Sequence, residues 1–123
     1  MYTLIVDDEQ AILEQAKIFL KQEDERIDVE TTVSGKKALQ KIRKGNYDAV
    51  ISDYLLPDLD GVEILRKLRK DGNDIFFIIL TGRDAEEAED ICLQSGADNF
   101  FMKTGSPKKL YQKIARAITE ETG

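Results

Sequence analysis

Four short apolar segments of this chain each run into polar side chains that can take part in metal or phosphoryl chemistry. They place Asp7 and Asp8 after residues 4–6, Asp53 after 49–52, Thr81 after 77–80 and Lys103 after 100–102. If these segments are neighbouring parallel strands, three carboxylates, one hydroxyl and one ammonium group meet at one edge of a sheet. Such a group would bind a divalent cation and accept a phosphoryl group on a carboxylate.

Each of these side chains has an expected part in phosphoryl transfer, which depends on positioning and on stabilising charge. Asp53 supplies the in-line nucleophile, and Asp7 and Asp8 supply metal ligands. Lys103 and Thr81 supply a cationic and a hydroxyl donor. Close carboxylates repel each other by roughly 4 kcal/mol per pair at an effective dielectric of about 20. Hard oxygen ligands around an open position suit Mg²⁺, which would relieve that repulsion.

Simpler interpretations exist for three of these residues. Asp8 alone could be the N-cap of the helix that follows it. Lys103 could be an ordinary surface lysine, and Thr81 a turn residue before Gly82. The capping interpretation leaves Asp7 and Asp53 unexplained.

Composition excludes several classes of function. The net charge of −6 offers no basic field for nucleic acid or an anionic membrane. The longest apolar run, 75–80, is far shorter than the roughly 20 residues that span a bilayer. Asp7, Asp8 and Glu9 interrupt the first apolar stretch, so we expect residues 1–9 not to act as a signal peptide. The lone Cys92 fits a small buried residue in a reducing compartment, so we expect a cytoplasmic protein.

The chain contains no histidine. This excludes Ser-His-Asp and Cys-His nucleophiles and any zinc site that uses imidazole. It also excludes a protein that stores phosphate on its own histidine.

Strand-like and helix-like segments alternate along the whole chain. The strand patterns cover 3–6, 27–33, 48–52, 75–80 and 98–102, and the helix patterns cover 9–22, 34–45, 62–70, 84–94 and a last segment from Pro107. The patterns at 48–52 and 75–80 are apolar enough to be buried strands, whereas the alternating pattern at 27–33 predicts a half-exposed edge strand. Five such units with short connections predict an α/β fold with a parallel sheet between layers of helices.

At this point the motifs match a known family. Val6-Asp7-Asp8-Glu9, Leu80-Thr81-Gly82, Gly96-Ala97-Asp98, Lys103 and the segment from Asp53 to Gly61 resemble, in order and spacing, the receiver domain of two-component response regulators. The resemblance extends over essentially all of residues 1–123, taken as one domain. It implies a chemotaxis-regulator-like, flavodoxin-like doubly wound sheet of five strands in the order 2-1-3-4-5.

The resemblance also implies roles for single residues. Asp53 would take a phosphoryl group from a phosphohistidine on a sensor histidine kinase or a histidine phosphotransfer protein. Mg²⁺ or Mn²⁺ would be held by Asp8, Asp53 and the backbone carbonyl of Leu55, with Asp7 assisting. Thr81 and Lys103 would bind phosphoryl oxygens, and Phe100 would be the switch residue coupled to Thr81. Such a protein is no conventional enzyme, but catalyses its own phosphorylation and dephosphorylation.

This chain departs from the family pattern near Lys103. The family's lysine is usually followed by proline in a cis peptide, whereas Thr104 and Gly105 follow here. A non-proline cis bond costs about 2.5–4 kcal/mol, so either that strain is retained or the loop differs.

The side chains around the site also differ from the family pattern or can modify it. Phe100 lacks the hydroxyl of the tyrosine often found at its position, so a switch would act by packing. Leu55 and Arg83 lie where side chains can tune the lifetime of the phosphate.

Two other functions remain to be weighed. Asp58-Leu59-Asp60-Gly61 imitates the nucleophile motif of haloacid-dehalogenase-type phosphatases, but Pro57 disfavours a strand just before it. The alternative is a receiver-like docking module without phosphorylation. The downstream partner is not indicated by the sequence, and the chain is either a stand-alone regulator or a receiver from a longer protein.

Overall fold

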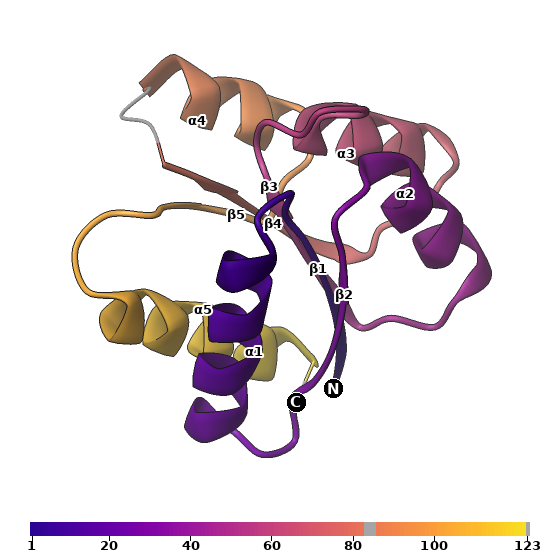
Figure 1. Cartoon of the computed structure of the whole chain (residues 1–123). Helices are drawn as coiled ribbons and strands as arrows, with labels where there is room; N and C mark the ends of the chain where they lie inside the picture. The colour runs from indigo at the N-terminus through magenta and orange to yellow at the C-terminus, as the bar shows by residue number, and fades with distance from the viewer. Residues whose placement is uncertain (83–85, 123) are drawn as a thin grey trace.

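Runs of β-branched and aromatic residues form a parallel sheet, and amphipathic segments between them form the helices that cover it (Figure 1). The computed structural model describes residues 1–82 and 86–122. The strands are β1 (Tyr2–Val6), β2 (Asp28–Thr32), β3 (Ala49–Asp53), β4 (Phe76–Thr81) and β5 (Asn99–Met102). The helices are α1 (Gln10–Glu23), α2 (Gly35–Lys44), α3 (Gly61–Lys70), α4 (Glu86–Gln94) and α5 (Pro107–Thr122).

The sheet has the order β2-β1-β3-β4-β5, and every neighbouring pair is parallel. This confirms the predicted flavodoxin-like order, including the prediction that the alternating segment 27–33 is an edge strand. Chain order reverses on the two sides of β1, so β1 and β3 are the strands beside the switch point. Ligands of such sheets bind beyond the carboxyl ends of the strands at that place.

The two faces of the sheet carry separate apolar clusters, because successive side chains of a strand point to opposite sides. Ile5, Ile51 and Ile78 pack with α1 and α5 on one face. Leu4, Val50 and Phe77 pack with α2 and α3 on the other. Figure 1 shows α1 and α5 together on one side of the sheet and α2, α3 and α4 on the opposite side, which is the predicted three-layer arrangement.

Local signals explain where several helices begin. The hydroxyl of Ser34 accepts a hydrogen bond from the amide of Lys37 at 3.2 Å and caps α2. Pro107 opens α5, where its missing N–H leaves no helical bond unmade. The helix expected over 84–94 is described from Glu86, and Asp84 lies outside the described residues.

Helix α4 buries only a narrow apolar stripe. Ala88 and Cys92 are buried, the latter as expected from the sequence, but Ile91 is 39% exposed. Ile91 therefore does not belong to the core. No helix within the described ranges is both long and apolar enough to cross a membrane.

Candidate functional site

The carboxyl ends of four adjacent strands bring the predicted site residues to one edge of the sheet. Asp7 and Asp8 directly follow β1, Asp53 is the last residue of β3, Thr81 is the last of β4, and Lys103 directly follows β5. The strand pairing aligns Asp53 with Leu80 and Thr81 with Met102. Residues separated by up to 96 positions in sequence thus become neighbours because the parallel register ends these strands at the same level.

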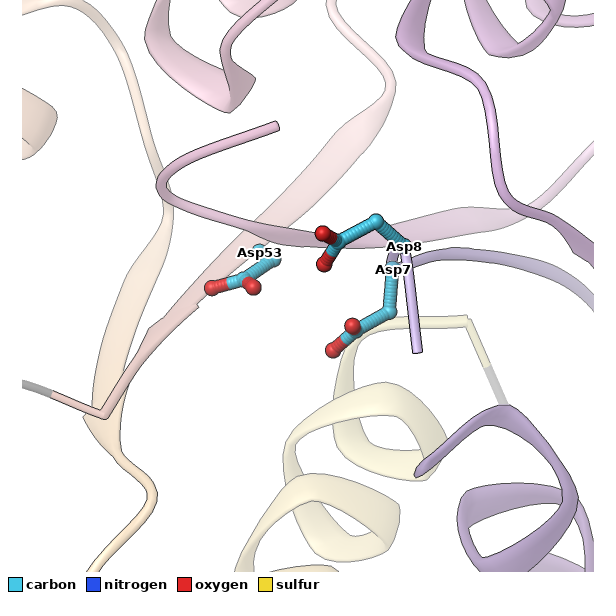
Figure 2. A group of neighbouring side chains, drawn as sticks. All are labelled: Asp7, Asp8 and Asp53. Atoms are coloured by element: carbon cyan, nitrogen blue, oxygen red, sulfur yellow. The ribbon is translucent and has the colours of Figure 1, made fainter. Parts of the chain in front are cut away.

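Three carboxylates gather at this edge. Asp7, Asp8 and Asp53 each offer an oxygen within 4.8 Å of the others, and Figure 2 shows the side chains meeting at the ends of the two neighbouring strands. Asp7 is 2% exposed, Asp53 is half-buried and Asp8 is exposed. A set of hard oxygen donors that opens to solvent on one side fits a divalent cation that keeps some of its waters.

Asp7 is held in place by the loops around it. Its amide donates to the carbonyl of Thr32 at 3.2 Å, and its carboxylate accepts a hydrogen bond from the amide of Glu9 at 3.0 Å. The N-cap position of α1 is occupied by Glu9, so the interpretation of Asp8 as a simple helix cap is wrong. Asp8 is left facing the solvent side of the carboxylate group.

Lys103 is integrated into the same group. Its ammonium nitrogen lies 2.7 Å from a carboxylate oxygen of Asp7 and 3.4 Å from one of Asp53, and its backbone amide donates to the carbonyl of Thr81 at 2.7 Å. The side chain is only 19% exposed, so Lys103 is not an ordinary surface lysine. Burial lowers the pKa of this ammonium group, but its hydrogen bond to Asp7 and the charge of Asp53 outweigh burial and raise the pKa overall.

Asp53 lies in a mixed environment. Burial is the main reason that its pKa is raised above the ordinary value, and the charge of Asp7 acts in the same direction. The positive charge of Lys103 opposes both effects. On balance the pKa of Asp53 is raised, which means that its ionised form is destabilised in the folded protein. A bound cation would reduce this destabilisation.

The remaining predicted residues lie around this centre. Thr81 is buried to 2% exposure at the end of β4. Phe100, on β5, is half-buried against the cluster that α2 and α3 cover. Leu55 is 45% exposed in the loop after Asp53. Arg83, expected to tune phosphate lifetime together with Leu55, lies outside the described residues.

The loop after Lys103 differs from the cis-proline pattern of the family. No peptide bond within residues 1–82 and 86–122 is cis, so the bond between Lys103 and Thr104 is trans. Gly105 has a φ of 74°, a left-handed conformation that glycine adopts without steric cost. Of the two alternatives from the sequence, the second is therefore found: the loop differs.

The segment between β3 and α3 is more ordered by side-chain contacts than the sequence indicated. The carboxylate of Asp60 accepts a hydrogen bond from the amide of Leu56 at 3.0 Å. A Cβ atom on Gly61 would lie 2.4 Å from the carbonyl oxygen of Asp53, so only glycine allows this close approach. Asp58 and Asp60 lie in this loop rather than at a strand end, which excludes the haloacid-dehalogenase interpretation.

Comparisons with known proteins agree with one another. The family model described as response regulator receiver domain matches residues 3–115. The response regulator SaeR of Staphylococcus aureus (strain USA300) is 32% identical over 118 residues, which cover 96% of this chain and 50% of SaeR. The chain thus spans about half the length of the curated relatives that it matches.

Solved structures give the same result. A CheY-like response regulator receiver domain protein from Methanospirillum hungatei JF-1 is 33% identical, with a TM-score of 0.83 over 98% of this chain and 94% of that one. The BeF3-activated DrrB receiver domain is 26% identical, with a TM-score of 0.81 over 97% of each chain.

Proposed function

The chain belongs to the receiver domain family of two-component response regulators, and on this basis we propose that Asp53 is its phosphoacceptor. The observation that carries the proposal is the grouping of Asp53 with Asp7, Asp8 and Lys103 at the carboxyl edge of the sheet. Residues 1–123 then act as one receiver domain. The phosphoryl donor is a phosphohistidine of a sensor histidine kinase or a histidine phosphotransfer protein.

The transfer itself exchanges one bond for another. A carboxylate oxygen of Asp53 attacks phosphorus as the bond from phosphorus to the histidine nitrogen breaks, and the nitrogen keeps the electron pair and gains a proton. The product on Asp53 is an acyl phosphate. The side chain is 17% exposed, so the nucleophile is shielded by its surroundings but still accessible to a donor group.

The carboxylates of Asp8 and Asp53 and the carbonyl of Leu55 would hold Mg²⁺ or Mn²⁺, with Asp7 contributing mainly charge. The bound cation would neutralise the phosphoryl oxygens during transfer. Asp7 already receives hydrogen bonds from Lys103 and from the amide of Glu9. Because the carboxylate oxygens of Asp7 already accept these hydrogen bonds, Asp7 would assist metal binding mainly through its charge. The exposed carboxylate of Asp8 is the more available ligand.

Lys103 and Thr81 would receive the phosphoryl oxygens. The ammonium group of Lys103 lies 3.4 Å from Asp53, close enough to reach an oxygen attached to that side chain. Thr81 ends the neighbouring strand β4, directly beside β3. A change in the position of Thr81 would be passed to Phe100, which lies on the adjacent strand β5 and would switch by packing.

We place this domain in the cytoplasm, where a histidine kinase presents its phosphohistidine. It would act as a phosphorylation-dependent switch of a protein-interaction surface and would catalyse only its own phosphorylation and dephosphorylation. The curated relatives are about twice as long as this chain, so the downstream partner or fused domain is left open.

Incubation with acetyl phosphate and Mg²⁺, followed by intact-protein mass spectrometry, tests the proposal. We expect a mass gain of one phosphoryl group in the wild-type protein, none without Mg²⁺ and none in Asp53→Asn. The BeF3-activated DrrB receiver domain suggests a second assay, in which beryllofluoride binding is followed by NMR. A wild-type protein that gains no phosphoryl group and binds no beryllofluoride would instead be a docking module.

A further inference from the structure

Asp58 joins two loops that are distant in sequence. Its carboxylate accepts hydrogen bonds from the hydroxyl of Ser34 at 2.7 Å, from the amide of Gly35 at 2.9 Å and from the amide of Lys36 at 3.0 Å. It also accepts one from the amide of Leu59 at 3.0 Å. Three of these four donors belong to the start of α2, so the Asp58 carboxylate joins that segment to the loop after β3.

The backbone packs closely at the same place. A Cβ atom on Gly35 would lie 2.2 Å from the carbonyl oxygen of Leu59, so the first turn of α2 is in direct contact with the loop. The hydrogen bonds of Asp58 and this backbone contact lie side by side. Together they fix the far end of the loop against α2.

The near end of the loop is fixed independently. The amide of Tyr54 donates to the carbonyl of Leu80 on β4 at 2.8 Å. Leu55 lies between the two anchors, and its exposed side chain contributes little to holding its own backbone. The peptide unit that carries the Leu55 carbonyl is held directly by Asp60, whose carboxylate accepts a hydrogen bond from the amide of Leu56 at 3.0 Å. The loop around this unit is anchored by Tyr54 on one side and by Asp58 on the other, so its place relative to the rest of the site depends on both anchors.

The segment that Asp58 contacts is also linked to the acidic pair. The carbonyl of Thr32, two residues before Ser34, accepts the hydrogen bond from the amide of Asp7. The amide of Ser34 in turn lies 3.4 Å from the hydroxyl of Thr32. Asp58 thus connects the loop of Leu55 with the loop of Asp7 and Asp8 through the β2–α2 turn.

From these contacts we propose that Asp58 is a positioning residue, which sets the Leu55 carbonyl at the correct place relative to the acidic pair for cation binding. This inference rests on the proposed function, because it assumes the Leu55 carbonyl as a ligand. The alternative is that Asp58 only stabilises the start of α2, where Ser34 already caps the helix.

Substitution Asp58→Ala tests the inference when paired with Asp48→Ala. Asp48 is also an exposed carboxylate that accepts a backbone hydrogen bond, from Tyr2 at 2.7 Å, but at the opposite end of the sheet. The readout is Mg²⁺ affinity, measured by calorimetric titration at a temperature where each variant is folded. We expect Asp58→Ala to raise the Kd for Mg²⁺ roughly ten-fold, as for other residues that orient metal ligands, and Asp48→Ala to leave it unchanged.

Asp58→Asn is the conservative variant, because it keeps the size of the side chain and one acceptor oxygen. Its Kd should lie between those of the wild type and Asp58→Ala, and it keeps the test valid if Asp58→Ala does not fold. A Kd equal to the wild-type value in both variants, with only stability lowered, would overturn the positioning role alone. A wild-type protein that binds no Mg²⁺ would overturn the proposed function and this role together.

Discussion

The ammonium group of Lys103 lies closer to Asp7 than to Asp53, at 2.7 Å and 3.4 Å respectively. One buried cation is therefore shared by two carboxylates, with its shorter contact to the more buried one. Asp7 has a 3% exposed side chain and so depends on Lys103 for compensation of its charge. The lysine expected to bind phosphoryl oxygens is thus also part of what holds the unphosphorylated site together.

Lys103→Met should lower the free energy of unfolding by about 3 kcal/mol in the absence of Mg²⁺, because it leaves the buried carboxylate of Asp7 without a cationic partner. Methionine keeps most of the volume, so the loss reports charge rather than packing. Urea denaturation followed by circular dichroism measures it. The double variant Asp7→Asn with Lys103→Met should recover much of the loss. An additive double variant would contradict the coupling.

Asp53→Asn should stabilise the metal-free protein at neutral pH. The pKa of Asp53 is raised, first by burial, so the folded protein binds its proton more tightly than the unfolded chain does. Ionisation therefore costs stability as pH rises from the ordinary value of 3.8 through the raised pKa, and the cost is fully present above both. Urea denaturation at several pH values should show a gain at pH 7 that narrows toward pH 4. A gain independent of pH would refute this cause.

Asp8→Asn should separate metal binding from folding. It removes one of three mutually repelling carboxylates, so metal-free stability should rise, although modestly because Asp8 is exposed. The same change removes the most available ligand and should weaken Mg²⁺ binding by more than about ten-fold. Melting curves with and without Mg²⁺ test both effects. Equal Mg²⁺-induced shifts in the variant and the wild type would count against the metal site.

The fold and the site centre were accessible from the sequence because both follow from short-range patterns. Apolar runs predicted the strands, and a polar residue at the end of each run predicted where Asp53, Thr81 and Lys103 would meet. Once the sheet is taken as parallel, the meeting of these residues follows, since a parallel sheet places the carboxyl ends of all its strands at one edge. The trans peptide after Lys103 could be stated only as one of two alternatives, because it depends on how the loop packs.

Contacts between loops were not accessible in this way. The sequence presents Asp58 as part of a phosphatase-like motif, yet its carboxylate accepts hydrogen bonds from the start of α2, 22 to 24 positions away. No local periodicity encodes such a pair, because both partners are exposed polar residues in irregular segments. The sharing of Lys103 between Asp7 and Asp53 was missed for the same reason: spacing predicts neighbours but not which of two carboxylates is closer.

Thr3 offers a stabilising change away from the site. It is fully buried in β1, and within the described residues its hydroxyl has no hydrogen-bond partner. Strand alternation places it on the same face as Ile5, toward α1 and α5. Burying a hydroxyl without a partner costs free energy that an apolar group of the same shape does not. Thr3→Val should therefore raise the free energy of unfolding by about 1 kcal/mol.

Denaturation in urea, with the slope of the transition compared between the two proteins, measures this gain. Thr3→Ser is the matched control: it keeps the hydroxyl and removes the methyl group, so it should destabilise the protein. Because Thr3 lies near the amino end of β1, at the opposite end of the sheet from Asp53, phosphorylation by acetyl phosphate should be unchanged in both variants. A Thr3→Val variant less stable than the wild type would mean that the hydroxyl bonds a buried water, which the valine cannot replace.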